Sequence, residues 1–176
     1  MSHLEHKEHA VAVKARVQIV TVSSSRYKQV LSGATAEDPS GKLAKERLTA
    51  FGHKVERYLV IPDNIGQVVR VLLEGLKLGL DATVLIGGTG VSPTDITVDA
   101  FQRLATRLLP GFSDRFHALS SERVGTASIV SRACAGFVGD HLVICLPGSK
   151  DAVEVGLFII LPELSHLIHH AKEACS

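Results

Sequence analysis

The sequence predicts a three-layer α/β/α fold whose mostly parallel β-sheet carries one antiparallel edge strand. Short apolar runs rich in Val and Ile alternate with longer segments whose apolar residues recur at helical spacing. This alternation is typical of right-handed strand–helix–strand crossovers, which build parallel sheets covered by helices on both faces. Two apolar runs around Gly139-Asp140 form a two-residue hairpin signal, which predicts the antiparallel strand.

The first third of the chain opens with a strand at residues 17–22 (VQIVTV), because its β-branched and almost wholly apolar residues fit a strand buried on both faces. Residues 23–41 are polar and rich in turn formers, so we expect a loop. Residues 42–51 place apolar side chains on one face of a helix, which Gly52 ends. Residues 54–60 predict the second strand.

The middle third continues the alternation of strand and helix. Residues 62–64 open a long helix whose apolar stripe runs from Ile65 to Leu80 with a period of about 3.6 residues. Residues 82–86 (ATVLI) predict a third, fully buried strand. After a glycine-rich segment a helix resumes near Thr97, which we expect to be its N-cap residue.

The last third combines helices with the hairpin. Residues 111–124 predict a helix, whereas residues 126–136 fit neither pattern clearly. The hairpin is expected across residues 136–146. Residues 147–174 predict a closing helix, which Pro162 should kink or divide because proline breaks the helical hydrogen-bond ladder.

Length and charge limit the classes of function. The 176 residues favour one domain over residues 15–176, preceded by a loosely ordered polar tail at residues 1–14. The formal net charge of +1, from 19 basic and 18 acidic residues, provides no global field for nucleic acid or anionic lipid. An apolar run of about 18 residues, as a membrane span requires, is not found in the sequence.

The cysteines favour a reduced, cytoplasmic setting. There are three, Cys134, Cys145 and Cys175, and their spacing matches neither a disulfide framework nor a zinc site. We interpret Cys134 and Cys145 as small buried hydrophobic residues.

The segment after the third strand predicts a phosphate-type site. Gly87-Gly88-Thr89-Gly90 offers unhindered backbone amides and a hydroxyl, which together can form an anion-binding concavity. The residues after Gly90 match neither a P-loop nor a dinucleotide-binding fingerprint. The alternative interpretation is a tight turn from strand to helix.

Two aspartates follow consecutive strands of the predicted sheet, at the edge where such sheets bind ligands. A carboxylate beside a phosphate site repels the ligand unless a cation lies between them, and Mg²⁺ prefers carboxylate and phosphate oxygens. Asp63 and Asp95 are therefore candidate magnesium ligands. Each is also well placed to cap the helix that follows it.

The segment LIGGTGVSPTDIT resembles the signature of the MoaB/Mog family of molybdenum cofactor biosynthesis proteins. Further segments agree with this family in the same order: IVTVSSSR (19–26), DPSG (38–41), IPDN (61–64), SRACAG (131–136) and LPGS (146–149). The resemblance covers roughly residues 15–173. The length of the chain is most similar to the MoaB branch.

This resemblance implies a molybdopterin-binding fold and a nucleotidyltransferase that moves AMP from MgATP to the terminal phosphate of molybdopterin and releases pyrophosphate. ATP and molybdopterin are then the substrates, and Mg²⁺ is the cofactor. It also implies a homo-oligomer, either trimer or hexamer, and a downstream metal-insertion protein as a partner. Asp63 and Asp95 would be the catalytic and metal-binding acids.

The resemblance also implies a set of substrate-binding positions: Ser23, Ser24, Ser40, Gly41, Gly87, Gly88, Thr89, Gly90, Ser92, Ser131, Arg132, Pro147, Gly148 and Ser149. Any of the serines could instead be an ordinary turn residue, and Arg132 could cap a helix end. The chain departs from many Mog-branch members at Thr94, where they carry arginine. This departure leaves open a carrier that binds molybdopterin without turnover. An oligomeric scaffold with a vestigial pocket is a third alternative, which the retained glycine loop disfavours.

Overall fold

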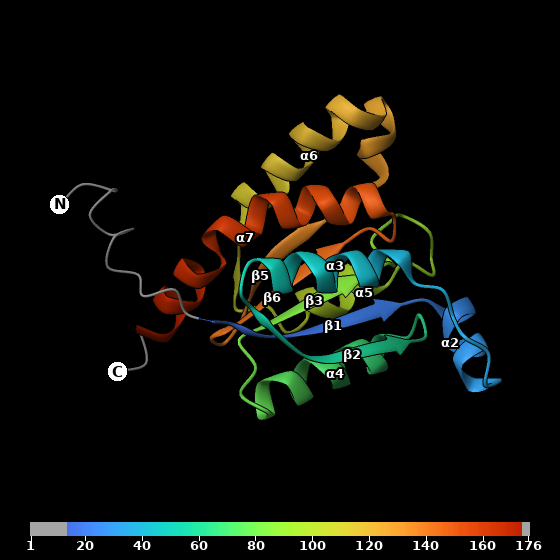
Figure 1. Ribbon diagram of the computed structural model, residues 1–176. Coiled ribbons are helices and arrows are strands. Elements are labelled where there is room, and N and C mark those ends of the chain that lie inside the picture. The colour runs from blue at the N-terminus through green and yellow to red at the C-terminus, as the bar shows by residue number, and fades with distance from the viewer. Residues whose placement is uncertain (1–13, 174–176) are drawn as a thin grey trace.

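The computed structural model describes residues 14–173, and within them the chain forms a six-stranded sheet with the order β2-β1-β3-β6-β5-β4 (Figure 1). The strands are β1 (Arg16–Val22), β2 (Lys54–Ile61), β3 (Ala82–Ile86), β4 (Arg107–Leu108), β5 (Cys134–Val138) and β6 (His141–Leu146). Strands β2, β1, β3 and β6 are parallel, while β5 runs antiparallel to β6. The predicted mostly parallel sheet is confirmed, and the short β4 pairs with β5 beyond it.

Helices cover both faces of the sheet, which confirms the three layers. They are α2 (Ser24–Leu31), α3 (Pro39–Ala50), α4 (Ile65–Lys77), α5 (Thr97–Gln102), α6 (Pro110–Val124), the 3₁₀ helix η1 (Gly125–Val130) and α7 (Lys150–Glu173). Helices α3, α6 and α7 pack on one face, and α4 and α5 pack on the other.

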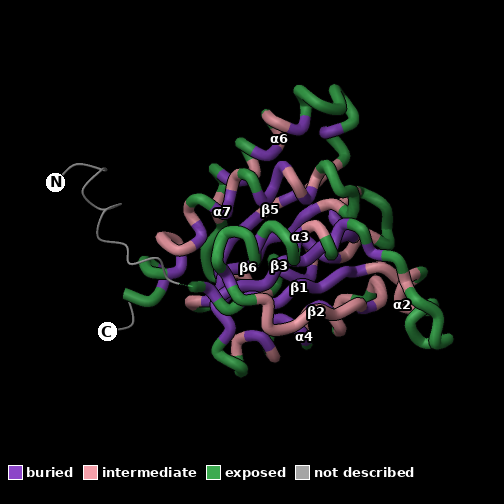
Figure 2. The backbone as a smooth tube through the Cα atoms, viewed as in Figure 1, coloured by how far each residue is buried: buried purple, intermediate pink, exposed green. Residues whose placement is uncertain are grey.

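Strand β1 shows how the sheet joins two cores. Val17 and Ile19 belong to the core beneath α3, α6 and α7, whereas Val20 and Val22 belong to the core above α4 and α5. Alternate side chains of a strand point to opposite faces, so a strand covered on both faces is apolar nearly throughout. Figure 2 shows the central strands as buried along most of their length.

The predicted loop at residues 23–41 is wrong in part, because it contains α2 and the start of α3. The Ser23 hydroxyl accepts a hydrogen bond from the Arg26 amide and caps α2. The Asp38 carboxylate accepts from the Gly41 amide and caps α3, with Pro39 in the first turn. Side-chain capping followed by proline is a known helix start, so turn-forming residues here initiate helices.

Two further boundaries differ from the predictions. Thr97 is the first residue of α5 and not its N-cap, because its hydroxyl donates to the Gly87 carbonyl instead. Pro162 does not divide α7, which runs unbroken from Lys150 to Glu173. Pro162 and Phe158 are both exposed, so the carbonyl that proline frees lies on the side of the helix facing water. The unassigned segment 126–136 is divided between η1 and β5.

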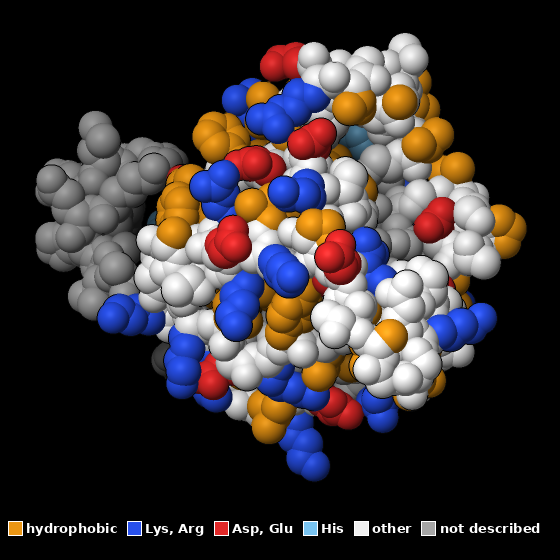
Figure 3. Space-filling view, turned by 45° about the vertical axis from the view of Figure 1, so that its right-hand side comes forward, with side chains coloured by type: hydrophobic (Ala, Val, Ile, Leu, Met, Phe, Trp, Pro, Cys, Tyr) orange, Lys and Arg blue, Asp and Glu red, His pale blue; other side chains and the backbone are white. Residues whose placement is uncertain are grey.

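Helix α7 is, among the described residues, the one helix that is long and apolar enough to cross a membrane by length and composition. It packs against β6, α3 and α6, and side chains along its whole length are buried in the core. A core helix of this kind passes the same test. Basic and acidic side chains are interspersed on the face shown in Figure 3, in keeping with the near-zero net charge.

The predicted tail at residues 1–14 lies outside the described residues except for Lys14, and so does Cys175.

A buried polar chain lies at the end of the sheet opposite the carboxyl ends of the parallel strands. The Gln18 amide nitrogen donates to the Val71 carbonyl (2.9 Å) and to Thr83 Oγ1 (2.8 Å). Thr83 Oγ1 lies 2.7 Å from His141 Nε2, and His141 Nδ1 lies 2.7 Å from the Leu80 carbonyl oxygen. Because a carbonyl only accepts, Nδ1 carries the proton and Nε2 accepts from Thr83. Burial lowers the pKa of His141 from its ordinary value of 6.5, so the ring is neutral.

We expect the free energy of unfolding to fall as the pH drops below about 6.5, and to go on falling until the pH reaches the lowered pKa of folded His141. In that pH window the unfolded chain binds a proton on His141, whereas the folded chain does not. Urea unfolding measured from about pH 8 to about pH 5 tests this. His141→Gln should flatten the profile without abolishing it, because burial also lowers the pKa of His53. Equal slopes for the variant and the natural protein would contradict the assignment.

Candidate functional site

Four segments meet at the carboxyl ends of the parallel strands. The amide of Gly87, after β3, donates to the Leu146 carbonyl at the end of β6 (2.9 Å). The amide of Ser23, after β1, donates to the Ile61 carbonyl at the end of β2 (2.8 Å). The expected convergence of the strand ends is therefore present, and the glycine loop, defined here as residues 87–95, lies at its centre.

The glycine loop turns its carbonyls toward α5. Gly87 and Gly88 have φ values of +104° and +64°, in the left-handed region that side chains disfavour. The Thr97 hydroxyl donates to the Gly87 carbonyl (2.7 Å), and the Thr97 amide donates to the Gly88 carbonyl (2.9 Å). Within residues 14–173, no acceptor receives a hydrogen bond from the amides of Gly88, Thr89 or Gly90. These three amides are free to bind an anion.

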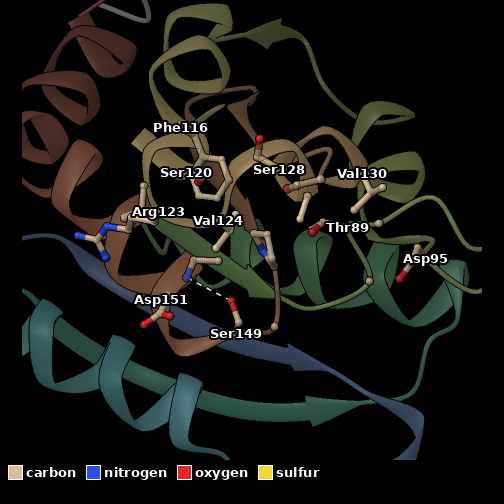
Figure 4. A pocket seen from close by; sticks show the side chains of 18 residues that line it. Thr89, Asp95, Phe116, Ser120, Arg123, Val124, Ser128, Val130, Ser149 and Asp151 are labelled. Carbon is tan, nitrogen blue, oxygen red and sulfur yellow. Dashed lines mark hydrogen bonds between the residues drawn. The ribbon is translucent and has the colours of Figure 1, made fainter. Parts of the chain in front are cut away.

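Two pockets adjoin the glycine loop. The main pocket has a volume of about 430 Å³, and the sticks in Figure 4 show its lining side chains. Its polar part is formed by Gly88, Thr89, Gly90, Asp95, Ser131, Pro147, Gly148 and Ser149. The second pocket, of about 300 Å³, is lined by Val91, Ser92, Pro93, Asp95, Asp99 and Arg132. Asp95 lines both pockets, so it lies between them.

The apolar wall of the main pocket comes from α6 and η1. Phe116, Val124, Ala127 and Val130 line it, together with the hydroxyls of Ser120 and Ser128. Sequence reasoning missed this wall, because α6 gave only a helical pattern and residues 126–136 gave no clear pattern at all. An apolar wall opposite polar loops is the usual lining of a site for a small molecule.

Both predicted acids lie beside the glycine loop. The Asp95 carboxylate accepts from the Ser92 amide at Oδ2 (2.9 Å), and that oxygen lies 2.6 Å from where a Cβ at Gly90 would stand. Asp63 Oδ2 accepts from the Ser24 amide (2.7 Å), and its Oδ1 lies 3.6 Å from the corresponding point at Gly88. Across the described residues, Oδ1 of each acid accepts no hydrogen bond. Each acid thus keeps one oxygen for a ligand.

Arg132 braces the glycine loop. Its guanidinium donates to the carbonyls of Gly90 (2.8 Å) and Asp95 (2.6 Å), and it pairs with both oxygens of Asp99 (2.9 and 3.0 Å). Its amide donates to the Thr89 carbonyl (2.8 Å). Hydrogen bonds from Arg132 hold the pKa of Asp99 below its usual range. The geometry thus assigns Arg132 a positioning role, and its predicted contact with substrate stays a prediction.

A layer of support lies beneath the pocket. Ser40 Oγ donates to the Gly148 carbonyl (2.7 Å), which ties α3 to the segment before α7. Asp38, which the site prediction left out, is buried and accepts from Tyr58 (2.7 Å) and the Thr21 hydroxyl (2.5 Å). Burial alone would raise the pKa of Asp38, but these hydrogen bonds outweigh it and lower the pKa.

The predicted substrate positions thus fall into two groups. Seven of them line the main pocket, and Ser92 and Arg132 line the second pocket. The other five line neither of these two pockets: Ser23, Ser24, Ser40, Gly41 and Gly87. Of the two predicted acids, Asp95 lines both pockets and Asp63 lines neither. Ser24 and Asp63 instead bind each other twice, since the Asp63 amide also donates to Ser24 Oγ (2.9 Å). These two hydrogen bonds connect the segment after β1 to the segment after β2.

The fold and the site define an α/β protein with a ligand site at the carboxyl ends of parallel strands and an anion-binding glycine loop. Residues 18–166 match the family model described as "Probable molybdopterin binding domain". The chain belongs to this molybdopterin-binding family, which confirms the resemblance to MoaB and Mog proteins.

Relatives in the family match nearly the whole chain. The chain is 38% identical over 156 residues to the "Probable molybdopterin adenylyltransferase" of Methanocaldococcus jannaschii, covering 88% of this chain and 93% of that protein. It is 37% identical over 173 residues to the "Molybdopterin adenylyltransferase" of Pyrococcus furiosus, covering 96% and 98%. A crystal structure of "Molybdenum cofactor biosynthesis protein B" is similar with a TM-score of 0.83 and 31% identity, covering 93% and 99%.

Gly88→Ala should lower the free energy of unfolding by about 1–3 kcal/mol, because the new Cβ would occupy a left-handed backbone position. It would also lie 2.5 Å from Thr97 Oγ1, the hydroxyl that holds the loop. Gly111→Ala in α6 is the matched control, since nothing lies within 4 Å of its Cβ position. We expect that control to be neutral or stabilising by up to about 1 kcal/mol. Urea unfolding measures both, and equal effects would contradict the described loop geometry.

Proposed function

We propose that this chain is a molybdopterin adenylyltransferase of the cytoplasm, which transfers AMP from MgATP to the terminal phosphate of molybdopterin and releases pyrophosphate. Two relatives that match almost the full chain carry this name. The proposal assigns both pockets and the glycine loop to one reaction between two substrates.

The position of Asp95 between two pockets carries the proposal. A transfer between two bound molecules requires two sites that touch at the reacting atoms, whereas a carrier of one ligand requires a single site. Asp95 lies at that boundary, and the unpaired amides of Gly88, Thr89 and Gly90 adjoin it. The apolar wall of Phe116 and Val124 supports binding of a flat heterocycle, such as a pterin or an adenine ring.

The reaction requires little covalent help from the protein. A terminal phosphate oxygen of molybdopterin attacks the α-phosphorus of ATP, a new P–O bond forms, and the bond from the α-phosphorus to the pyrophosphate oxygen breaks. Both substrates are anionic, so the protein must align them and offset their repulsion. In the proposal the three free amides hold phosphate oxygens with fixed dipoles, and the Arg132 brace keeps those amides in place.

Asp63 and Asp95 fit a magnesium ion by the chemistry of their donors. Both present a carboxylate oxygen without a described protein partner beside the glycine loop, and hard oxygen donors of this kind suit Mg²⁺. When bound, magnesium would neutralise part of the polyphosphate charge. The acids would then hold the metal, while the loop amides contact phosphate directly.

Self-association as a trimer or hexamer forms part of the proposal, as does a downstream metal-insertion protein as a partner. Val124, Ile129 and Val130 support a contact between copies, because these apolar side chains at the end of α6 and in η1 are 52%, 76% and 54% exposed. The two oligomeric states remain alternatives.

A non-catalytic molybdopterin carrier is the second candidate. Thr94 stands where many Mog-branch members carry an arginine beside the loop acid. The guanidinium of Arg132 is hydrogen-bonded to loop carbonyls and to Asp99. The second pocket therefore has no cation other than Arg132 among its lining residues. Tight pterin binding without adenylate formation would favour the carrier.

Asp95→Asn should lower the rate of molybdopterin adenylylation by about 10²–10³-fold, because the amide keeps an oxygen for the Ser92 amide but loses the negative charge. The free energy of unfolding should change by less than about 1 kcal/mol. Release of AMP from the adenylylated product after mild acid treatment measures turnover.

Asp114→Asn is the control for this change, since Asp114 is exposed on α6 and lines neither of the two pockets. The control should keep the natural rate. Undiminished turnover in Asp95→Asn would rule out the role assigned to that carboxylate.

A further inference from the structure

Two thiols near the site take no part in the proposed reaction. Cys134 opens β5, Cys145 lies on β6, and the two residues stand directly opposite each other in the antiparallel ladder. Both are free thiols. Directly opposed residues of such a ladder have Cα atoms about 4.5–5.5 Å apart and side chains on the same face. A disulfide requires a Cα separation of about 4.4–6.8 Å, a range that includes the separation typical of such opposed residues.

The two thiols differ in access. Cys145 is fully buried in the core above α4 and α5, whereas Cys134 is half-buried at the edge of the same core. One thiol can therefore meet a small oxidant from solution, while the other lies opposite it on the neighbouring strand.

Charge near the pair favours the accessible sulfur as the nucleophile. The neighbouring Cys145 thiol, together with the nearby Arg132 guanidinium, lowers the pKa of Cys134. Burial raises the pKa of Cys145. A thiolate is the reactive form of cysteine, so Cys134 should react first and Cys145 second.

We propose that Cys134 and Cys145 are a redox-active pair that closes to a cross-strand disulfide with a peroxide as the oxidant. The Cys134 thiolate attacks one peroxide oxygen, an S–O bond forms, the O–O bond breaks, and hydroxide leaves. The Cys145 thiolate then attacks the Cys134 sulfur, an S–S bond forms, and the S–O bond breaks with loss of a second hydroxide. The two thiol protons convert both hydroxides to water, and a dithiol reductant reverses the change.

The two cysteines lie on strands whose ends lead into residues of the main pocket. This structural link does not depend on the proposed function. Ser131 lies just before β5, and Pro147 to Ser149 come directly after β6; all four line the main pocket. The disulfide would tie together the strand ends that carry these two parts of the pocket lining. The inference can therefore be tested by the covalent chemistry alone.

The test uses the full chain with Cys175→Ala, which removes the thiol outside the described residues. Treatment with hydrogen peroxide should give a mass lower by two hydrogen atoms and no thiol that alkylates after denaturation. Dithiothreitol should restore both thiols. Cys145→Ala in this background should leave a sulfenic acid on Cys134 that dimedone traps, and Cys134→Ala should leave Cys145 reduced.

Two results would overturn the proposal. The first is survival of both thiols in the Cys175→Ala chain under the peroxide exposure that oxidises Cys134 in the Cys145→Ala variant. The second is loss of thiols only through disulfides between two chains, seen as a covalent dimer. Both alanine variants replace a small apolar side chain by a smaller one, so the comparison does not depend on a disruptive change in the core.

Discussion

The site depends on the double hydrogen bond between Thr97 and the glycine loop. The Thr97 hydroxyl and amide donate hydrogen bonds to the carbonyls of Gly87 and Gly88. These bonds hold the left-handed backbone, which directs the following amides opposite to these carbonyls. Only glycine adopts this conformation without strain, and a Cβ at Gly88 would also strike the Thr97 hydroxyl. The structural reading of the loop, a tight turn from strand to helix, and the functional reading, an anion site, are therefore the same geometry.

A second constraint holds the far end of the loop. Arg132 joins the carbonyls of Gly90 and Asp95 to the carboxylate of Asp99, and its own amide binds Thr89. The side chains of Arg132 and Asp99 are 34% and 46% exposed, so solvent screening keeps the contribution of the pair to stability small. Its importance lies in geometry: the planar guanidinium fixes several acceptors at once, which a flexible ammonium could not do.

The residues explain which parts of this architecture could be predicted from sequence. Buried strands such as residues 82–86 have a local signature, and the glycine loop has an unusual composition, so both were found. Helix α2 was missed because its start depends on the Ser23 hydroxyl, one of three consecutive serines, and none of its residues is buried. Strand β4 has two residues and exists only through its pairing with β5.

The site was predicted on the same basis, with the same kind of gap. Loop positions that follow strands, including Asp63 and Asp95, could be placed at one edge because parallel strands bring their ends together. The wall of Phe116 and Val130 could not, since it forms only when α6 and η1 fold over the strand ends. Roles such as that of Arg132 were left open, because a sequence does not show whether a guanidinium faces a ligand or the protein's own carbonyls.

Assigned amide NMR spectra of the full chain, recorded while pyrophosphate is added with magnesium, test the central claim most directly. If the free amides of the glycine loop bind phosphate, the resonances of Gly88, Thr89 and Gly90 shift most and saturate together. The hydrogen-bonded amide of Gly87 should shift less, because it already donates to Leu146. Unmoved resonances for these three residues, with saturable shifts elsewhere in the chain, would contradict the account.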